Sequence, residues 1–389
     1  MRIAWRKFAL LAERFFWSSP VVTRSAPHIR DAANVQRLWN YFVLASLPAW
    51  LIGLWSVGNQ TNLAIADFQL TQLPGWRAWL LERSGLGFDA FSPLACFAHG
   101  LLYFLPLFLC VLFVGACWEV LFATVRKRRL DEGLLAIAWF FALLMPAGVP
   151  LHLAALGMSF AIVVGKLIYG GSGRYLVNPA LLGLAFLVFS WPGLLFGPGT
   201  WVPVAGYDQP SVLELVATEG GLSVVAAVDY GFWQLFLGDR PGAFGTVSTL
   251  GIALGALFLV RAGVASWRLI IGGLIGVAVG GLAGAALFPG NVVFTLPWHW
   301  QLVLGGFAFG LVFLATDPVA GPMTDKGRWG FGLLVGGLTV VFRGGSDAYY
   351  EAVMFAILLA SLFAPLIDFV VKEANIRRRR RRLRDALNE

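Results

Sequence analysis

The sequence predicts an all-α integral membrane protein with about ten transmembrane helices and both termini in the cytoplasm. Its 389 residues are 58% hydrophobic and only 13% charged, and the mean hydropathy is +0.75. Soluble domains, by comparison, have about 25% charged residues. Apolar segments of about 20 residues recur along the chain, and this length crosses a hydrocarbon core of about 30 Å. Segments that cross lipid must be helical, because their backbone polar groups find no other partners there.

This pattern divides the chain into a basic, amphipathic segment over residues 1–38, a ten-helix membrane domain over 39–371 and a basic tail over 372–389. The predicted spans are Trp39–Val57, Leu101–Thr124, Gly133–Val149, Leu151–Ile168, Pro179–Phe196, Phe244–Val260, Trp267–Phe288, Trp300–Ala315, Gly330–Phe342 and Ala352–Val371. The short third and fourth spans are separated only by PAGVP, so a broken, tightly turned unit is the alternative to two plain crossings. The 46 glycines cluster in spans, which predicts closely packed helices.

Basic residues indicate the topology, because cytoplasmic loops of membrane proteins carry an excess of Lys and Arg. With ten spans and a cytoplasmic N-terminus, every basic cluster falls on the inner side, whereas an odd number of spans breaks this agreement. These clusters are Arg126–Arg129, Arg174, Arg261 with Arg268, Lys326 with Arg328, and the tail from Arg377. The net charge of +8 therefore indicates topology and contact with anionic membrane lipids, and we expect no nucleic-acid partner.

Two acidic residues lie inside predicted spans. Glu119 is toward the inner end of the second span, and Asp368 is in the last third of the tenth. A charge at the centre of a membrane helix costs about 2.5–3.5 kcal/mol, so such a group is retained for a reason. One interpretation is a cation or proton path, and the other is an interfacial carboxylate that pairs with Arg or Lys.

The most distinctive loop is KLIYGGSGRYLVNPALLG, Lys166–Gly183. Its backbone N–H groups, Arg174 and the Asn178 amide have the chemistry to hold a polar planar ligand at the inner face. The alternative is an ordinary turn in which Asn178 caps the helix that begins at Pro179. The cysteines and histidines show no metal-ligand spacing, and no dinucleotide-binding motif is present, so we expect neither a metal site nor an NADH site.

Several stretches resemble one family over nearly the whole chain. They are VGNQ at 57–60, WEVLFATVR at 118–126, GGSGRYLVNPALLGLAF at 170–186, PGAFGTVSTLGIALG at 241–255 and LATDPVAGPMTDKGRWGFGLLVGG at 314–337. Together they resemble the B subunit of the Na⁺-translocating NADH:quinone reductases, the NqrB/RnfD family. Two of these stretches contain an Asx-Pro pair in a glycine-rich loop before a span, Asn178-Pro179 and Asp317-Pro318. Their similarity hints at an internal repeat.

The resemblance implies a subunit of a Na⁺-transporting NADH:ubiquinone reductase, a translocase of the bacterial inner membrane. Such a subunit carries FMN and riboflavin, passes electrons toward ubiquinone coupled to Na⁺ transport, and assembles with the other subunits of the complex. The corresponding positions are Arg174, Asn178 and Pro179 for riboflavin, Gly115, Ala116 and Glu119 for quinone, and Glu119 with Asp368 for the ion path.

The family attaches FMN through its phosphate to a threonine in a motif like D-G-F-S-G-A-T. Here the matching stretch is AGYDQPS, and the acceptor position is Ser211. Ala205 replaces the leading acid, Pro210 restrains the backbone next to the acceptor, and Asp208 puts a negative charge near an incoming phosphate. We therefore expect no covalent FMN at Ser211.

Two functions stay open on these grounds. The first is a redox subunit of a Na⁺-pumping NADH:quinone reductase. The second is a divergent scaffold or ion-path subunit of another membrane redox complex that has lost covalent FMN. The presence or absence of the remaining subunits, including one that binds NADH, separates the two.

Overall fold

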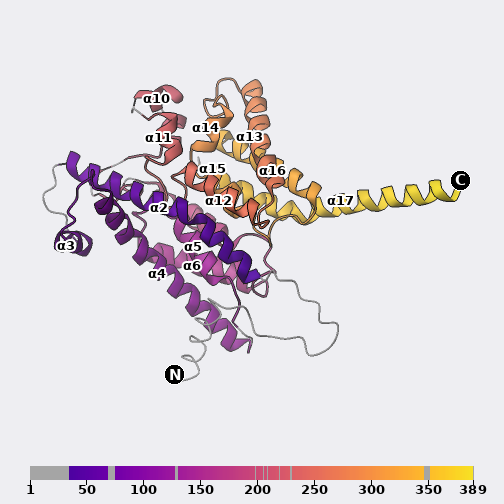
Figure 1. Ribbon diagram of the computed structural model, residues 1–389, viewed down its shortest axis with the longest axis horizontal. Helices are drawn as coiled ribbons and strands as arrows, with labels where there is room; N and C mark the ends of the chain where they lie inside the picture. Colours follow the sequence, from indigo (N-terminus) through magenta and orange to yellow (C-terminus); the bar gives the residue numbers. More distant parts are fainter. Residues whose placement is uncertain are drawn as a thin grey trace. The chain divides into compact units, whose positions relative to one another are not determined.

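The structure, a computed structural model, describes residues 35–388 except 69–74, 128–129, 198, 205, 208, 219, 228–229 and 346–350. The predicted N-terminal segment over 1–38 therefore lies almost entirely outside the described residues. The chain divides into two compact units: unit 1 is Met1–Val212 with Asp229–Val264, and unit 2 is Leu213–Val228 with Ala265–Glu389. All regular secondary structure in the described ranges is helical (Figure 1), as predicted.

Unit 1 holds the helices of the first six predicted spans. Its elements are α2 (Val35–Asp67), α3 (Trp76–Arg83), α4 (Pro93–Val125), α5 (Leu134–Leu144), α6 (Leu151–Ile162), the π-helix η1 (Val163–Leu167), α7 (Pro179–Ser190), α8 (Pro192–Phe196), α11 (Phe232–Leu237) and α12 (Thr249–Arg261). Helix α2 packs against α4 and α12, and α6 packs against α4 and α7. Rings of Trp50, Phe104 and Trp139 meet at centroid distances of 5.2–5.5 Å and fill the space between α2, α4 and α5.

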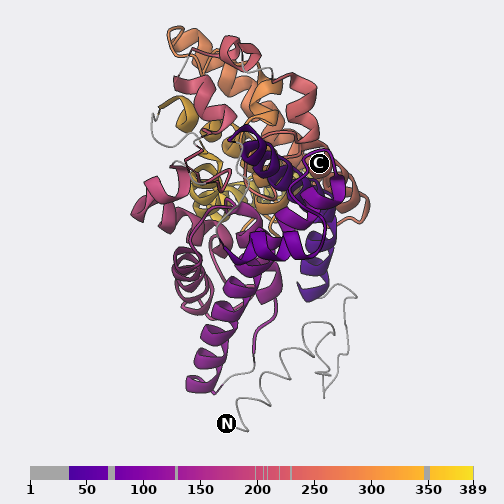
Figure 2. The same ribbon diagram turned by 90° about the vertical axis from the view of Figure 1, so that its left-hand side faces the viewer.

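Unit 2 holds the helices of the last four predicted spans. After α9 (Val212–Thr218) and α10 (Leu222–Ala227) come α13 (Trp267–Leu287), α14 (Trp298–Val303), α15 (Phe307–Phe309), the π-helix η2 (Gly310–Leu314), α16 (Asp325–Gly345) and α17 (Val353–Asn388). Helices α13 and α16 run side by side (Figures 1 and 2). A Cβ atom on Gly336 would lie 2.2 Å from the carbonyl oxygen of Gly273. The two backbones therefore approach as closely as the glycine-rich spans predict.

Some helices are longer than the predicted spans, and others are shorter. Among the described helices, α2, α4, α13 and α17 are long and apolar enough to cross a membrane. By contrast, α5 has 11 residues, which is about 16 Å at 1.5 Å per residue. The third predicted span thus contains only α5, and residues Met145–Pro150 join it to α6, which continues through η1 to Leu167.

Helix α2 ends at Asp67 rather than Val57, and α4 begins at Pro93 rather than Leu101. The polar residues that suggested a loop after Val57 are helical because distant segments provide partners for them. Asn59 and Gln60 both donate to the Asp239 carboxylate, at 3.3 and 3.1 Å. Their side chains are buried without losing hydrogen bonds, so the helix continues.

The eighth predicted span is interrupted between α14 and α15, and two charged side chains bridge the interruption. Arg343 of α16 is 1% exposed and donates to the backbone oxygens of Gln301 and Leu304, both at 2.9 Å. These carbonyls lie at the C-terminal end of α14, where a cation is favoured. The Glu351 carboxylate accepts the Gly306 N–H at 2.8 Å, just before α15, where an anion is favoured.

The two units share a local motif. In unit 1 the Oδ1 atom of Asn178 accepts the N–H groups of residues two and three positions further on, at 3.0 and 3.4 Å. In unit 2 the Oδ1 atom of Asp317 does the same at 2.8 and 3.4 Å. Each Asx-Pro turn follows a five-residue π-helix, η1 or η2. This shared geometry supports the internal repeat that the sequence hinted at.

Candidate functional site

The candidate functional site in unit 1 is an ion pair between two helices. Glu119 projects from α4, and Lys166 lies in the π-helix η1. The Lys166 ammonium donates to Glu119 Oε1, and the two side chains are 0% and 1% exposed. Lys166 also donates to the backbone oxygen of Glu132 at 2.9 Å. A π-helical turn inside an α-helix is frequent at functional sites, and here it carries the buried cation.

Short polar contacts hold the loops around this pair. The Ser172 hydroxyl donates to the same Glu132 carbonyl oxygen that accepts from Lys166. Arg126, at the end of α4, donates to the Leu167 carbonyl oxygen at 2.7 Å. Gly171 has a φ of +108°, and a Cβ atom there would overlap the Asp131 carboxylate. The loops before α5 and after η1 are thereby tied to each other and to Lys166.

One oxygen of Glu119 is free to bind something else. Within the part of the chain that the structure describes, Glu119 Oε2 is buried and has no hydrogen-bond partner. Glu119 lines a cavity of about 30 Å³ whose wall also includes Asp131, Arg126 and Leu167. A cavity needs about 10–15 Å³ to hold a water molecule, so this space suits one dehydrated monovalent cation or a water.

The predicted quinone positions are occupied by helix packing. A Cβ atom on Gly115 would lie 2.7 Å from the Leu134 side chain and 2.8 Å from Met158, and Ala116 is 7% exposed. The cavity beside Glu119 is about tenfold smaller than the roughly 300 Å³ from which small-molecule pockets begin. The quinone role of Gly115, Ala116 and Glu119 therefore stays a prediction.

The loop before α7 has the geometry of a capping turn. Asn178 is buried, and its side-chain oxygen caps α7, which begins with Pro179. Arg174, by contrast, is exposed and lies over Gly170. The two groups that we expected to converge on a planar ligand are thus used differently, and the turn interpretation accounts for Asn178 and Pro179.

The predicted flavin-attachment stretch packs against the extension of α2. Val204 is buried in a cluster with Ala64 and Ile65, and Gln209 donates to the Tyr230 hydroxyl at 2.9 Å. Burial raises the pKa of Tyr230 to about 12, so its hydroxyl stays neutral. Ser211 itself is 9% exposed and directly precedes α9. The expected absence of covalent FMN at Ser211 therefore stays a prediction; the altered positions Ala205 and Asp208 lie outside the described residues.

In unit 2, Asp368 has a structural role that the sequence did not reveal. Its Oδ2 atom accepts the Met323 N–H at 2.7 Å, and its Oδ1 atom accepts the Thr324 N–H at 3.1 Å and the Thr324 hydroxyl. These donors come immediately before α16. The carboxylate therefore joins α17 to the start of α16, and its membership of an ion path stays a prediction.

Lys166 and Arg343 are two buried charges that the sequence analysis did not single out. A third is Arg240, which is 4% exposed and donates to the carbonyl oxygens of Val247 and Thr246. Lys166 falls inside the fourth predicted span, in the apolar run AIVVGKLI, and a lysine in such a run is itself a signal for a paired acid. Arg343 follows directly after the predicted ninth span, which ends at Phe342, whereas α16 continues to Gly345. No local pattern distinguishes a loop arginine from one that caps another helix.

The helices and the site define a class: a helical membrane protein whose first unit buries an acid–lysine pair beside a cation-sized cavity. Comparison with known proteins places it further, because the chain belongs to the NQR2, RnfD, RnfE family, which matches residues 22–377. The B subunit of the Na⁺-translocating NADH-quinone reductase of Chromohalobacter salexigens is 42% identical over 382 residues, which cover 97% of this chain and 92% of the relative. The corresponding B subunit of Klebsiella pneumoniae (strain 342) is 41% identical over 386 residues, with 95% and 93% covered.

Proposed function

We propose that this chain is the B-type membrane subunit of a Na⁺-translocating NADH:quinone reductase complex in a bacterial inner membrane. The observation that carries the proposal is similarity of about 40% identity along more than nine-tenths of both chains to subunits with that name. The proposal includes ten spans with both termini in the cytoplasm, supported by the positions of the basic clusters. The other subunits supply the NADH site, for which this chain has no motif.

Within this function, Glu119 is the acid of the ion path and Lys166 is its resident cation. The Lys166 ammonium occupies one carboxylate oxygen. The other oxygen has no hydrogen-bond partner among the described residues, and Glu119 lines the small cavity. The pair is neutral, so it is far less costly inside a membrane than a lone carboxylate. A Na⁺ ion that reaches Oε2 is repelled by the ammonium on the same carboxylate. Na⁺ and Lys166 therefore compete for Glu119.

The proposal treats the two flavins, FMN and riboflavin, differently. Covalent FMN is not part of it, because the attachment motif is altered around Ser211, a buried residue that follows Pro210. Riboflavin and ubiquinone rest on the family resemblance alone, since Asn178 is explained by capping α7. No electron-transfer step is therefore assigned to particular residues of this chain.

Deleting the chain in its host tests the function. Membrane vesicles from the deletion strain should lose NADH-driven ubiquinone reduction that is stimulated by NaCl over KCl, and expression of the wild-type chain should restore it. The restored, tagged chain should purify together with an NADH-binding subunit. Unchanged Na⁺-stimulated activity in the deletion strain would contradict the proposal.

The altered motif around Ser211 favours a second function, a scaffold or ion-path subunit of another membrane redox complex. Its signature is a copurifying complex without an NADH-binding subunit. Because the two complexes differ in composition, mass spectrometry of the purified assembly separates the two functions independently of the activity.

The protein purified from its own host should show no covalent flavin. On a denaturing gel under ultraviolet light, we expect a dark band, because a buried serine after proline is a poor phosphoester acceptor. A fluorescent band that disappears in Ser211→Ala would prove the attachment and contradict this prediction. The homologous chain of a relative with the threonine motif, run beside it, is the positive control.

A further inference from the structure

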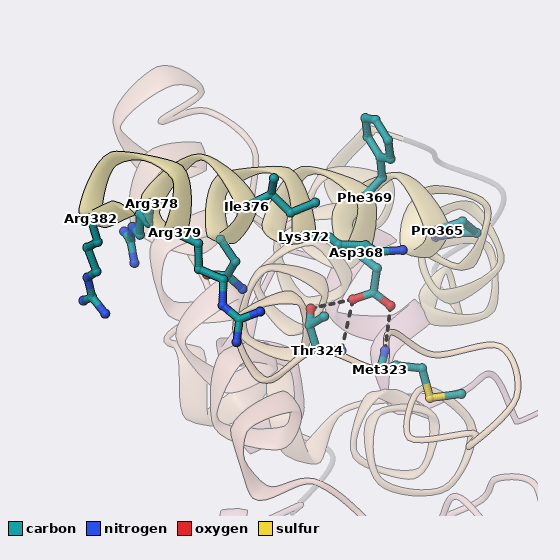
Figure 3. A pocket seen from close by; sticks show the side chains of 11 residues that line it. Met323, Thr324, Pro365, Asp368, Phe369, Lys372, Ile376, Arg378, Arg379 and Arg382 are labelled. Carbon is teal, nitrogen blue, oxygen red and sulfur yellow. Dashed lines mark hydrogen bonds between the residues drawn. The ribbon is translucent and has the colours of Figure 1, made fainter. Parts of the chain in front are cut away.

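A groove runs along one face of α17 in unit 2 (Figure 3). It has a volume of about 900 Å³, which is at the upper end of the range for small-molecule sites. One wall of the groove is α17, and the other is formed by Met323 and Thr324 in the loop before α16. The residues that α17 contributes are Pro365, Asp368, Phe369, Lys372, Asn375, Ile376, Arg378, Arg379 and Arg382.

The groove follows from the periodicity of α17. Positions 365, 368, 372, 375, 379 and 382 are separated alternately by three and four residues, so they lie on one face of the helix. The basic run of the tail is therefore divided between faces. Arg379 and Arg382 line the groove, whereas Arg380 and Arg381 do not.

The groove has an apolar end and a cationic end. Pro365 and Met323, which is 67% exposed, form the apolar end. Arg378, Arg379 and Arg382 form the cationic end, and among the described residues none of the three forms an ion pair. Lys372 lies between the two ends, with its ammonium toward Pro365 (Figure 3). Asp368 forms no ion pair with these arginines among the described residues; its oxygens accept hydrogen bonds from Met323 and Thr324.

Neighbouring residues place the groove at a membrane–water interface. Trp267 at the start of α13 and Trp329 in the first turns of α16 form an edge-to-face pair, with centroids 5.7 Å apart. Arg268 pairs with Asp325 at 3.0 Å beside them. Tryptophan and arginine gather where headgroups meet the hydrocarbon. Since Asp368 bonds to the residue just before Asp325, the groove lies at this level.

We propose that this groove binds one membrane phospholipid with an anionic headgroup. The phosphate lies between Arg379 and Arg382, and the first part of an acyl chain lies toward Pro365 and Met323. An arginine fork matches phosphate oxygens, and the apolar end gives the acyl chain a surface that a free anion does not use. The occupant must therefore be amphiphilic, and it must be negatively charged.

Two double variants of equal charge test this site. Arg379→Gln/Arg382→Gln removes two of the three arginines that line the groove, and Arg380→Gln/Arg381→Gln removes two arginines that do not line it. The full-length protein in detergent is titrated with phosphatidylglycerol, phosphatidylcholine and inorganic phosphate, and bound species are counted by native mass spectrometry. All four side chains are exposed, so both variants should fold, and equal melting temperatures would verify this.

We expect one saturable phosphatidylglycerol on the wild type. The groove variant should bind it at least tenfold more weakly, because each basic residue near a headgroup contributes appreciably to anionic lipid binding. The control variant should change affinity less than threefold. Equal weakening in both variants would show diffuse attraction to the tail and overturn the site. Equal occupancy by phosphatidylcholine or by inorganic phosphate would overturn the choice of an anionic lipid. The assay contains no NADH, quinone or Na⁺, so its outcome is independent of the proposed function.

Discussion

Replacing Lys166 with methionine should destabilise the protein and make its stability depend on Na⁺. The change leaves Glu119 buried without its cation, and removal of one partner of a buried pair costs about 3–5 kcal/mol. The melting temperature in KCl should fall by about 5–10 °C, at roughly 2 °C per kcal/mol for a chain of this size. Replacing KCl with NaCl should recover part of the loss, because Na⁺ takes the vacated place beside the carboxylate.

The double variant Glu119→Gln/Lys166→Met is the matched control. Replacing both members of a buried pair is often nearly neutral, so its melting temperature should return close to that of the wild type. It should show no difference between NaCl and KCl, because the carboxylate is absent. A Lys166→Met protein as stable as the wild type, or a double variant no better than the single one, would refute the pairing.

Activity separates the ion role of the pair from its structural role. In Lys166→Met, the Na⁺ concentration for half-maximal quinone reduction should fall about tenfold, because the resident competitor is gone. The double variant should have near-normal stability and no Na⁺ stimulation. If the double variant keeps its Na⁺ stimulation, Glu119 is not on the ion path, and the pair only holds α4 to η1.

Replacing Arg343 with methionine should cause a comparable loss of stability in unit 2. Arg343 donates to the carbonyls of Gln301 and Leu304 and to the Gln301 side chain, at 2.7–2.9 Å. Each buried acceptor left without a donor costs about 1–3 kcal/mol, so we expect a total of about 3–5 kcal/mol, measured as a lower melting temperature in detergent. Arg343→Lys should recover only part of this, because an ammonium lacks the planar fork.

An exposed arginine at a helix end gives the comparison for Arg343. Arg261, in the last turn of α12, is exposed, and Arg261→Met should change stability by less than about 0.5 kcal/mol. If both variants have the same melting temperature, the interruption between α14 and α15 does not depend on Arg343.

A smaller loss of stability is expected for Glu351→Gln. The glutamine keeps an acceptor for the single N–H of Gly306 and loses only the charge.

Much of the fold is predictable because lipid constrains membrane segments strongly. A run of apolar residues in a bilayer must be helical, and each of the ten predicted segments contains helix in the structure. Helix ends are predicted less well where distant residues provide partners. Asn59 and Gln60, read locally, indicate the end of α2, but the Asp239 carboxylate allows the helix to continue.

The candidate site is predictable only in part. Glu119 stands out because a carboxylate in an apolar run is costly. Lys166 carries the same signal but sits at the edge of a glycine-rich loop, where it resembles an ordinary interfacial lysine. Asp368 stands out for the same reason as Glu119, yet its hydrogen bonds to Met323 and Thr324 depend on how α16 and α17 pack.

The order of residues is enough to predict the class of protein, its helical segments, its family and the two acids inside predicted spans. These properties depend on composition and on spacing along one helix, which the order of residues contains directly. Which charges meet, by contrast, depends on how the helices pack. The pairing of Glu119 with Lys166, the capping of α14 by Arg343 and the groove beside α17 join residues that are far apart in the chain. Such contacts arise from packing between helices, and packing is a property of the whole unit rather than of any segment within it.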